Sequence, residues 1–305
     1  MIPVVKVAQL EKQLTFPVQL EAPYNFLHNY FDLPCSGGCI FSLLHCNIDD
    51  NKVHFAAMSS YDKAAQSENL WGVFVTEFEK LAVPMYHSMI SVCYAIKQKN
   101  SKKIHSGLLE VKSGVLQISK FFYAKISHQF INKEVWLQYI QGFEAWGIDE
   151  DEGLTGAHIL CTNAVDAFCQ IKGESAVSHF VKENRDHMTG KMRKFLVSLE
   201  QSGLSQYILS IINSTDEDCK KCVELYNDIV HAMYVFRVGH KKRIVQYFDR
   251  SCPERMPMTA GGGVISEKNY GVVVEKQVDS IQLFEGRLNR RIEETKNSII
   301  VNTSS

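Results

Sequence analysis

Residues 219–249 read CKKCVELYNDIVHAMYVFRVGHKKRIVQYFD, and the rest of the chain is organised around this stretch. Its apolar side chains recur at spacings of three and four residues, which is the period of a helix with one buried face. The stripe consists of Cys222, Leu225, Tyr226, Ile229, Val230, Met233, Phe236, Ile244 and Phe248. The spacing therefore predicts a long amphipathic helix.

His240 lies on the same stripe, one turn after Phe236, and Arg237 precedes it by three residues. One interpretation is that the imidazole ligates the metal of a cofactor, while the guanidinium pairs bidentately with an anionic group of that cofactor. The other is that His240 is a core histidine bonded to a backbone carbonyl, because buried polar groups usually have such a partner.

Composition and charge exclude several classes of protein. The 305 residues include 33 Lys and Arg against 34 Asp and Glu, so the net charge of -1 gives no general reason to bind nucleic acid or an anionic membrane. Residues 1–14 lack the pattern of a signal peptide, and no run of about 18 apolar residues is present. We therefore expect a soluble, cytoplasmic protein.

Nine cysteines are scattered along the chain, and without secretory features they are interpreted as reduced thiols. Cys219 and Cys222 form a CxxC, but no second CxxC or histidine pair follows at zinc-site spacing. We expect ordinary buried thiols there in preference to a zinc or redox site.

The predicted fold class is mainly α: a large helical bundle domain at residues 66–305 behind a small mixed region at residues 1–65. Short strands and an irregular cap both fit the smaller region. Helical periodicity begins near residue 68, and Pro84 should kink or break the first long helix. Further helices are predicted at 108–127, 133–146 (with Asn132 as N-cap), 157–173, 175–188, 189–201, 205–213 and 272–297.

The predicted helix at 157–173 is apolar on nearly all sides, which places it in the centre of the bundle. Asp166 is its single acid. Because an unpaired charge in a core is costly, Asp166 needs a cation or several hydrogen-bond donors. Residues 256–263, MPMTAGGG, are long and flexible enough to fold back over a pocket.

Four stretches together resemble the heme-dependent indoleamine/tryptophan 2,3-dioxygenase superfamily, of which the chain would be a divergent, bacterial-type member. They are GLTGAHILCTNAVDAFCQIKG (153–173), NRDHMTGKMRKFLVSLE (184–200), FRVGHKKRIVQYF (236–248) and TAGGGV (259–264), and their order is that of the family. The resemblance extends from about Trp71 to the end of the chain. It implies a helical fold that encloses heme b.

The resemblance also implies a role for each matching residue. His240 would be the proximal iron ligand, Arg237 a partner of a heme propionate, and Asp166 the acid paired with Arg237. On the distal side, Thr155, Gly156 and Ala157 would leave room for dioxygen and an aromatic ring. Candidate pocket walls are Trp71, Val75, Val135 and Trp136, and the lid positions are Ala260, Gly261 and Gly262; plain core packing is the alternative for each wall residue.

Two residues depart from the family pattern. Ile140 stands where tryptophan-cleaving members carry an Arg that grips the substrate carboxylate, so either the substrate lacks that group or another residue binds it. His158 is an addition after the distal loop. It is either a proton donor or substrate contact, or a solvated residue at a helix N-terminus.

The resulting functional hypothesis is a heme-dependent oxygenase that uses O2 on an indole or tryptophan-derived aromatic, with both oxygen atoms inserted into the ring. The alternatives are a heme monooxygenase or peroxygenase of secondary metabolism, a non-catalytic heme- or ligand-binding protein, and a heme-free helical interaction module. Expected partners are a small aromatic substrate and O2, with no nucleic acid and no membrane.

Overall fold

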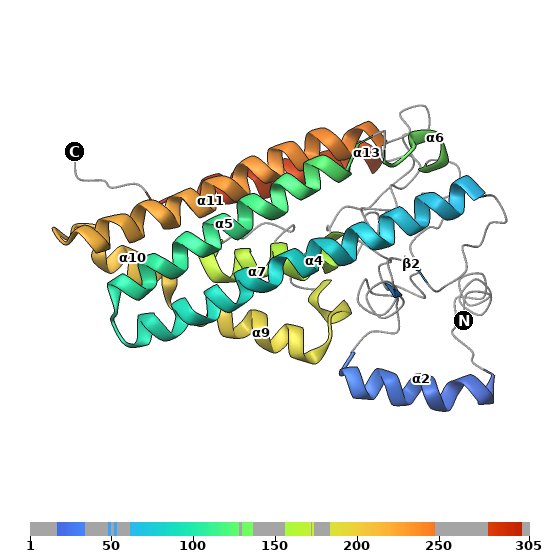
Figure 1. Cartoon of the computed structure of the whole chain (residues 1–305), viewed down its shortest axis with the longest axis horizontal. Coiled ribbons are helices and arrows are strands. Elements are labelled where there is room, and N and C mark those ends of the chain that lie inside the picture. The colour runs from blue at the N-terminus through green and yellow to red at the C-terminus, as the bar shows by residue number, and fades with distance from the viewer. Residues whose placement is uncertain are drawn as a thin grey trace.

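The computed structural model describes residues 17–33, 48–49, 52–53, 62–127, 130–136, 156–171, 173, 184–247 and 280–300. These residues form helices almost throughout, so the mainly α fold class is confirmed (Figure 1). The elements are α2 (Val18–Phe31), β1 (Ile48–Asp49), β2 (Lys52–Val53), α4 (Asp62–Lys97), α5 (Ser101–Lys125), α6 (Lys133–Val135), η3 (Gly156–His158), α7 (Leu160–Cys169), η4 (Asn184–His187), α9 (Gly190–Glu200), α10 (Leu204–Ile211), α11 (Glu217–Ile244), η5 (Val245–Tyr247) and α13 (Ser280–Lys296).

Helices α4 and α5 form a long antiparallel pair. Asn100 begins α5 as its N-cap, with its side chain accepting a hydrogen bond from the Lys103 N–H. The two helices approach closely at Gly107, where an added Cβ would lie 2.4 Å from Cγ2 of Val92. Small residues at such points let two helix backbones pack side by side.

Pro84 lies inside α4, and the helix continues through it to Lys97. Of the two effects predicted for Pro84, a kink or a break, the break was wrong. A proline in a helix interior forfeits one backbone hydrogen bond, at a cost of about 3 kcal/mol or more. The helix survives because its residues on both sides of Pro84, including Phe78, Met85 and Met89, are almost completely buried in the core.

Helix α11 confirms the long amphipathic helix predicted at 219–249. Asp216 is its N-cap and accepts from the Cys219 N–H at 2.9 Å. The buried residues are those of the predicted stripe from Cys222 to Phe236. The α-helix ends at Ile244 and continues as the 3₁₀ turn η5, while Phe248 lies outside the described residues. Figure 1 shows α11 beside α5, with α13 behind it.

Helix α7 is buried along almost its whole length, as predicted for a central helix. The Tyr226 hydroxyl of α11 donates to the carbonyl of Cys169 at 2.8 Å, and α9 also packs against α7. This central position brings the single acid of α7 next to α11.

The N-terminal region contains one element that the sequence pattern did not predict, the exposed helix α2, which has no buried residues. Short strands, one of the two options considered for this region, are present as β1 and β2, each two residues long. They pair antiparallel, with Ile48 opposite Val53. The long helices begin at Asp62, close to the predicted boundary at residue 65. The division into two domains stays a prediction.

Candidate functional site

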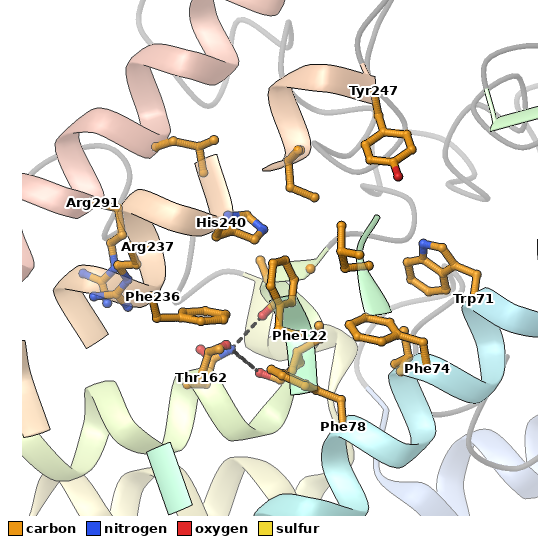
Figure 2. A pocket seen from close by; sticks show the side chains of 18 of the residues that line it. Trp71, Phe74, Phe78, Phe122, Thr162, Phe236, Arg237, His240, Tyr247 and Arg291 are labelled. Carbon is orange, nitrogen blue, oxygen red and sulfur yellow. Dashed lines mark hydrogen bonds between the residues drawn. The ribbon is translucent and has the colours of Figure 1, made fainter. Parts of the chain in front are cut away.

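A cavity of about 230 Å³ lies among α4, α5, α7, α11, η5 and α13 (Figure 2). Most of its wall is apolar and aromatic, with polar groups gathered at one end. The lining residues are Trp71, Phe74, Val75, Phe78, Phe122, Ile126, Ile131, Trp136, Gly156, Ala157, Ile159, Thr162, Asn163, Asp166, Phe236, Arg237, His240, Ile244, Tyr247, Arg287, Leu288 and Arg291. A concave apolar site with a few converging polar groups is typical of ligand binding.

His240 projects from α11 into this cavity, between the arginine end and the tryptophan end (Figure 2). Its imidazole packs against Phe122 and Phe236, with ring centroids 5.4 and 6.0 Å away. Burial, followed by the nearby Arg237 charge, lowers the pKa of His240 to about 4. The ring is therefore neutral near pH 7, and neutral imidazole is the form that ligates metals.

The part of the chain that the structure describes does not give His240 the hydrogen bond expected for an ordinary core histidine. Among the described residues the His240 imidazole makes no hydrogen bond, so a lone pair and an N–H both remain available at the cavity wall. Of the two interpretations of His240, the carbonyl-bonded core histidine is thus not what these residues form. The metal-ligand interpretation stays a prediction.

The position of His240 is set by a close approach of α11 to α5. A Cβ on Gly239 would lie 2.3 Å from the Tyr123 hydroxyl oxygen, so a side chain larger than hydrogen does not fit there. The same hydroxyl donates to the backbone carbonyls of Val235 and Phe236, at 3.2 and 3.1 Å. The glycine and the tyrosine together hold this turn of α11 against α5.

Asp166 and Arg237 form the predicted pair. Nη2 of Arg237 lies 2.6 Å from both carboxylate oxygens, and Arg237 also donates to the Thr295 hydroxyl. A second arginine, Arg291 of α13, donates to Oδ2 of the same carboxylate. Although burial by itself raises the pKa of Asp166, the Arg237 and Arg291 charges and hydrogen bonds bring it below its usual value, so Asp166 stays ionised.

The residues predicted for the distal segment are only partly gathered at the cavity. Gly156 and Ala157 line the cavity, and Thr155 lies outside the described residues. His158 is buried and is not among the lining residues: its Nε2 lies 2.9 Å from Oδ1 of Asn184, and its ring stacks on His187 at 4.4 Å. The solvated alternative for His158 was wrong, because the residue is only 5% exposed.

The predicted pocket walls divide into three groups. Trp71, Val75 and Trp136 line the cavity, and the two indoles stack with ring centroids 6.4 Å apart. Val135 is buried but is not among the lining residues. Ile140, together with the lid positions Ala260, Gly261 and Gly262, lies outside the described residues.

Several wall residues were not predicted. Phe74 and Phe78 follow Trp71 at helical spacing on α4, and this i, i+3, i+7 pattern was the available signal. Tyr247 comes from η5 and packs edge-on against Trp136, with ring centroids 6.1 Å apart. Arg287 and Arg291 are one helical turn apart on α13. Their spacing puts them on one face, but only the packing of α13 shows which helix that face meets.

The two cysteines of the CxxC pair differ in burial, because Cys219 is partly exposed. Cys222 is buried, its sulfur lies 3.6 Å from the Ser101 carbonyl, and burial raises the pKa of both Cys219 and Cys222. Within the described ranges, no three His, Cys, Asp or Glu side chains converge to hold a metal ion. A heme iron needs only one such protein ligand on its proximal side.

No protein-family model and no curated protein matches the chain. None of the described helices is long and apolar enough to cross a membrane.

Proposed function

We propose that this chain is a heme-dependent oxygenase that uses O2 on an indole or tryptophan-derived aromatic. The observation that carries the proposal is His240, a neutral imidazole without a hydrogen-bond partner among the described residues, at the wall of an aromatic cavity. Arg237 lies one turn away and is held by Asp166.

The residues of the cavity fit a bound heme b in three respects. His240 supplies a neutral nitrogen ligand for iron, and the packing of its ring against Phe122 and Phe236 fixes the direction of that ligand. The apolar walls would exclude water from a bound macrocycle. Arg237 offers a cation at the edge of the cavity, where the acidic groups of a porphyrin would lie.

The division of labour follows from these positions. Heme, when bound, supplies the activation of dioxygen for attack on an electron-rich ring. The chain orients the aromatic substrate against Trp71 and Trp136, and the ion pair of Asp166 with Arg237 keeps the helix that carries His240 in place.

The size of the cavity sets a condition on the proposal. Ligand sites commonly enclose about 300–1,000 Å³, and the volume here is about 230 Å³. A porphyrin is larger than this volume, so heme binding requires the cavity to widen. Titration of the purified protein with hemin measures whether heme binds.

The test of function begins with the absorption spectrum of protein expressed with iron and a heme precursor. A Soret band at one heme per chain is expected, followed by oxygen consumption with a panel of indoles with and without carboxylates. Product mass then separates dioxygenation, a gain of two oxygen atoms, from monooxygenation, a gain of one. Absence of any Soret band after heme reconstitution would falsify the proposal.

The volume favours one second candidate, a non-catalytic protein that binds a single aromatic acid. An indole ring is closer in size to the cavity than a macrocycle is, and arginines stand at one end of it. This candidate predicts stoichiometric binding of an indole carboxylate to heme-free protein, without oxygen consumption.

A further inference from the structure

One face at the start of α7 lines the cavity with Ile159, Thr162, Asn163 and Asp166 (Figure 2 labels Thr162). These residues follow one another at i, i+3, i+4 and i+7, which is a single stripe along a helix. Asp166 is already bound by two arginines. The stripe therefore also places an amide side chain, that of Asn163, at the cavity wall about one turn before the acid.

Two backbone carbonyls fix the orientation of the Asn163 amide. Its Nδ2 donates to the carbonyl oxygens of Ala157 and Ile159, each at 2.8 Å. A carbonyl oxygen can only accept a hydrogen bond, so the amide nitrogen, and not the amide oxygen, must face these two groups. Both N–H groups of the amide are used in this way, and the acceptor Oδ1 lies on the other branch of the amide.

Oδ1 of Asn163 is buried and has no hydrogen-bond partner among the described residues. The residue as a whole is only 3% exposed, so the bulk solvent does not take the place of a partner. Most buried polar atoms are paired, because an acceptor that leaves water without a partner loses its hydrogen bonds with the solvent. In a side chain that lines a cavity, a bound molecule with a donor group can supply the partner.

The other walls indicate what kind of molecule would carry that donor. Flat aromatic side chains stand around the cavity, among them Trp71, Phe74 and Phe78 (Figure 2). Aromatic rings pack favourably against one another in offset or edge-on arrangements. A flat ring with one N–H group matches both features, because its faces meet the aromatic walls while its edge offers a donor to Oδ1 of Asn163.

We infer that Asn163 is a specificity-determining residue of this cavity, and that its Oδ1 accepts a hydrogen bond from the ring N–H of a heteroaromatic ligand. The inference deepens the proposed function, and rests on it in that this ligand is the aromatic substrate. It selects rings that carry an N–H over rings of the same shape without one. Because Oδ1 is already out of water before the ligand arrives, the new hydrogen bond needs no further desolvation of the acceptor.

The test compares indole with benzofuran, in which an oxygen atom replaces the N–H in a ring of nearly the same shape. Dissociation constants are measured by isothermal titration calorimetry on the full chain, both heme-free and after reconstitution with hemin. The proteins are the wild type, Asn163→Leu and Asn213→Leu. Asn213 is the matched control, because it is exposed and is not among the lining residues.

The wild type should bind indole about tenfold more tightly than benzofuran, the upper end of what a hydrogen bond between neutral groups contributes. Asn163→Leu is similar in size but lacks Oδ1, so the preference for indole should disappear. Asn213→Leu should keep the preference of the wild type. The comparison is made between two ligands of the same variant, so any change in the cavity that affects both ligands equally cancels.

A second measurement covers the case in which Asn163→Leu does not fold, since this substitution also removes the bonds to Ala157 and Ile159. A crystal structure of the wild type with indole should place the ring nitrogen about 2.7–3.2 Å from Oδ1 of Asn163. A ring nitrogen that points away from this oxygen would overturn the inference without any variant.

The outcomes separate this inference from the proposed function. If hemin loads and oxygen is consumed, but indole and benzofuran bind equally well, the role of Asn163 is wrong and the oxygenase proposal stands. If the preference for indole depends on Asn163 in heme-free protein that never shows a Soret band, the role of Asn163 stands and the heme proposal falls. A preference for indole that survives in Asn163→Leu means that another residue accepts the N–H, and it overturns the inference.

Discussion

Asp166 of α7 binds Arg237 of α11 through both carboxylate oxygens, each 2.6 Å from Nη2 of the arginine. The two residues are 71 positions apart, and their side chains are 7% and 12% exposed. This pair joins the central helix of the bundle to the helix that carries His240, one turn before the imidazole. The geometry of the cavity therefore depends on an interaction that is buried and charged.

Asp166→Asn should destabilise the protein by about 3–5 kcal/mol, because it leaves two buried arginines without their shared counter-charge. The free energy of unfolding from urea denaturation measures the effect. Asp228→Asn is the control: Asp228 pairs with Lys112 on α5, but its side chain is 50% exposed. Exposed pairs contribute about 0–1 kcal/mol, so Asp228→Asn should lower the free energy of unfolding only slightly. Equal decreases for the two variants would contradict the role given to Asp166.

His240→Ala should abolish stoichiometric heme binding, since it removes the neutral nitrogen that faces the cavity. The Soret absorbance per chain after reconstitution with hemin is the measurement. His231→Ala, at an exposed position on the same helix, should load heme as the wild type does. A normal ferric spectrum in the His240 variant would defeat the assignment of this residue.

The stability of the heme-free protein should decrease between about pH 6.5 and pH 4 because of His240. Its pKa in the folded state is about 4, against an ordinary value of 6.5. In this window the unfolded chain binds the proton before the folded chain does, so each step toward acid favours unfolding. His240→Gln removes this contribution. As the pH is lowered, the free energy of unfolding of this variant should therefore decrease less steeply than that of the wild type. Parallel curves would mean that the imidazole titrates normally in the folded protein.

Gly239→Ala should destabilise the protein by about 1–3 kcal/mol, the usual cost of forcing extra atoms into a packed interior. The added methyl group would overlap the ring and hydroxyl of Tyr123. Gly286→Ala on α13 is the matched control, because an added Cβ there meets nothing within 4 Å. In a helix interior, Ala is otherwise favoured over Gly by roughly 1 kcal/mol. Thermal unfolding of both variants distinguishes a clash from a propensity effect, and a stabilised Gly239→Ala would show that α5 and α11 can separate.

Much of the helical architecture could be predicted because helical periodicity is local. The stripe on α11, the N-cap at Asn132 and the nearly all-apolar α7 each depend on residues within a few turns of one another. The predicted break at Pro84 was wrong for the complementary reason. Its local cost is real, but burial of the surrounding turns of α4 offsets it, and burial depends on other helices.

The sequence by itself determined that His240 and Arg237 share one helix and that the acid of α7 requires a cation, since spacing and the cost of a buried charge are enough for both. Only the tertiary structure decided that Arg291 shares this acid, that Phe122 from α5 packs on the imidazole, and that His158 turns away toward Asn184. The physical reason is that periodicity specifies which face of a helix is buried. Which other helix covers that face depends on packing between segments far apart in the chain.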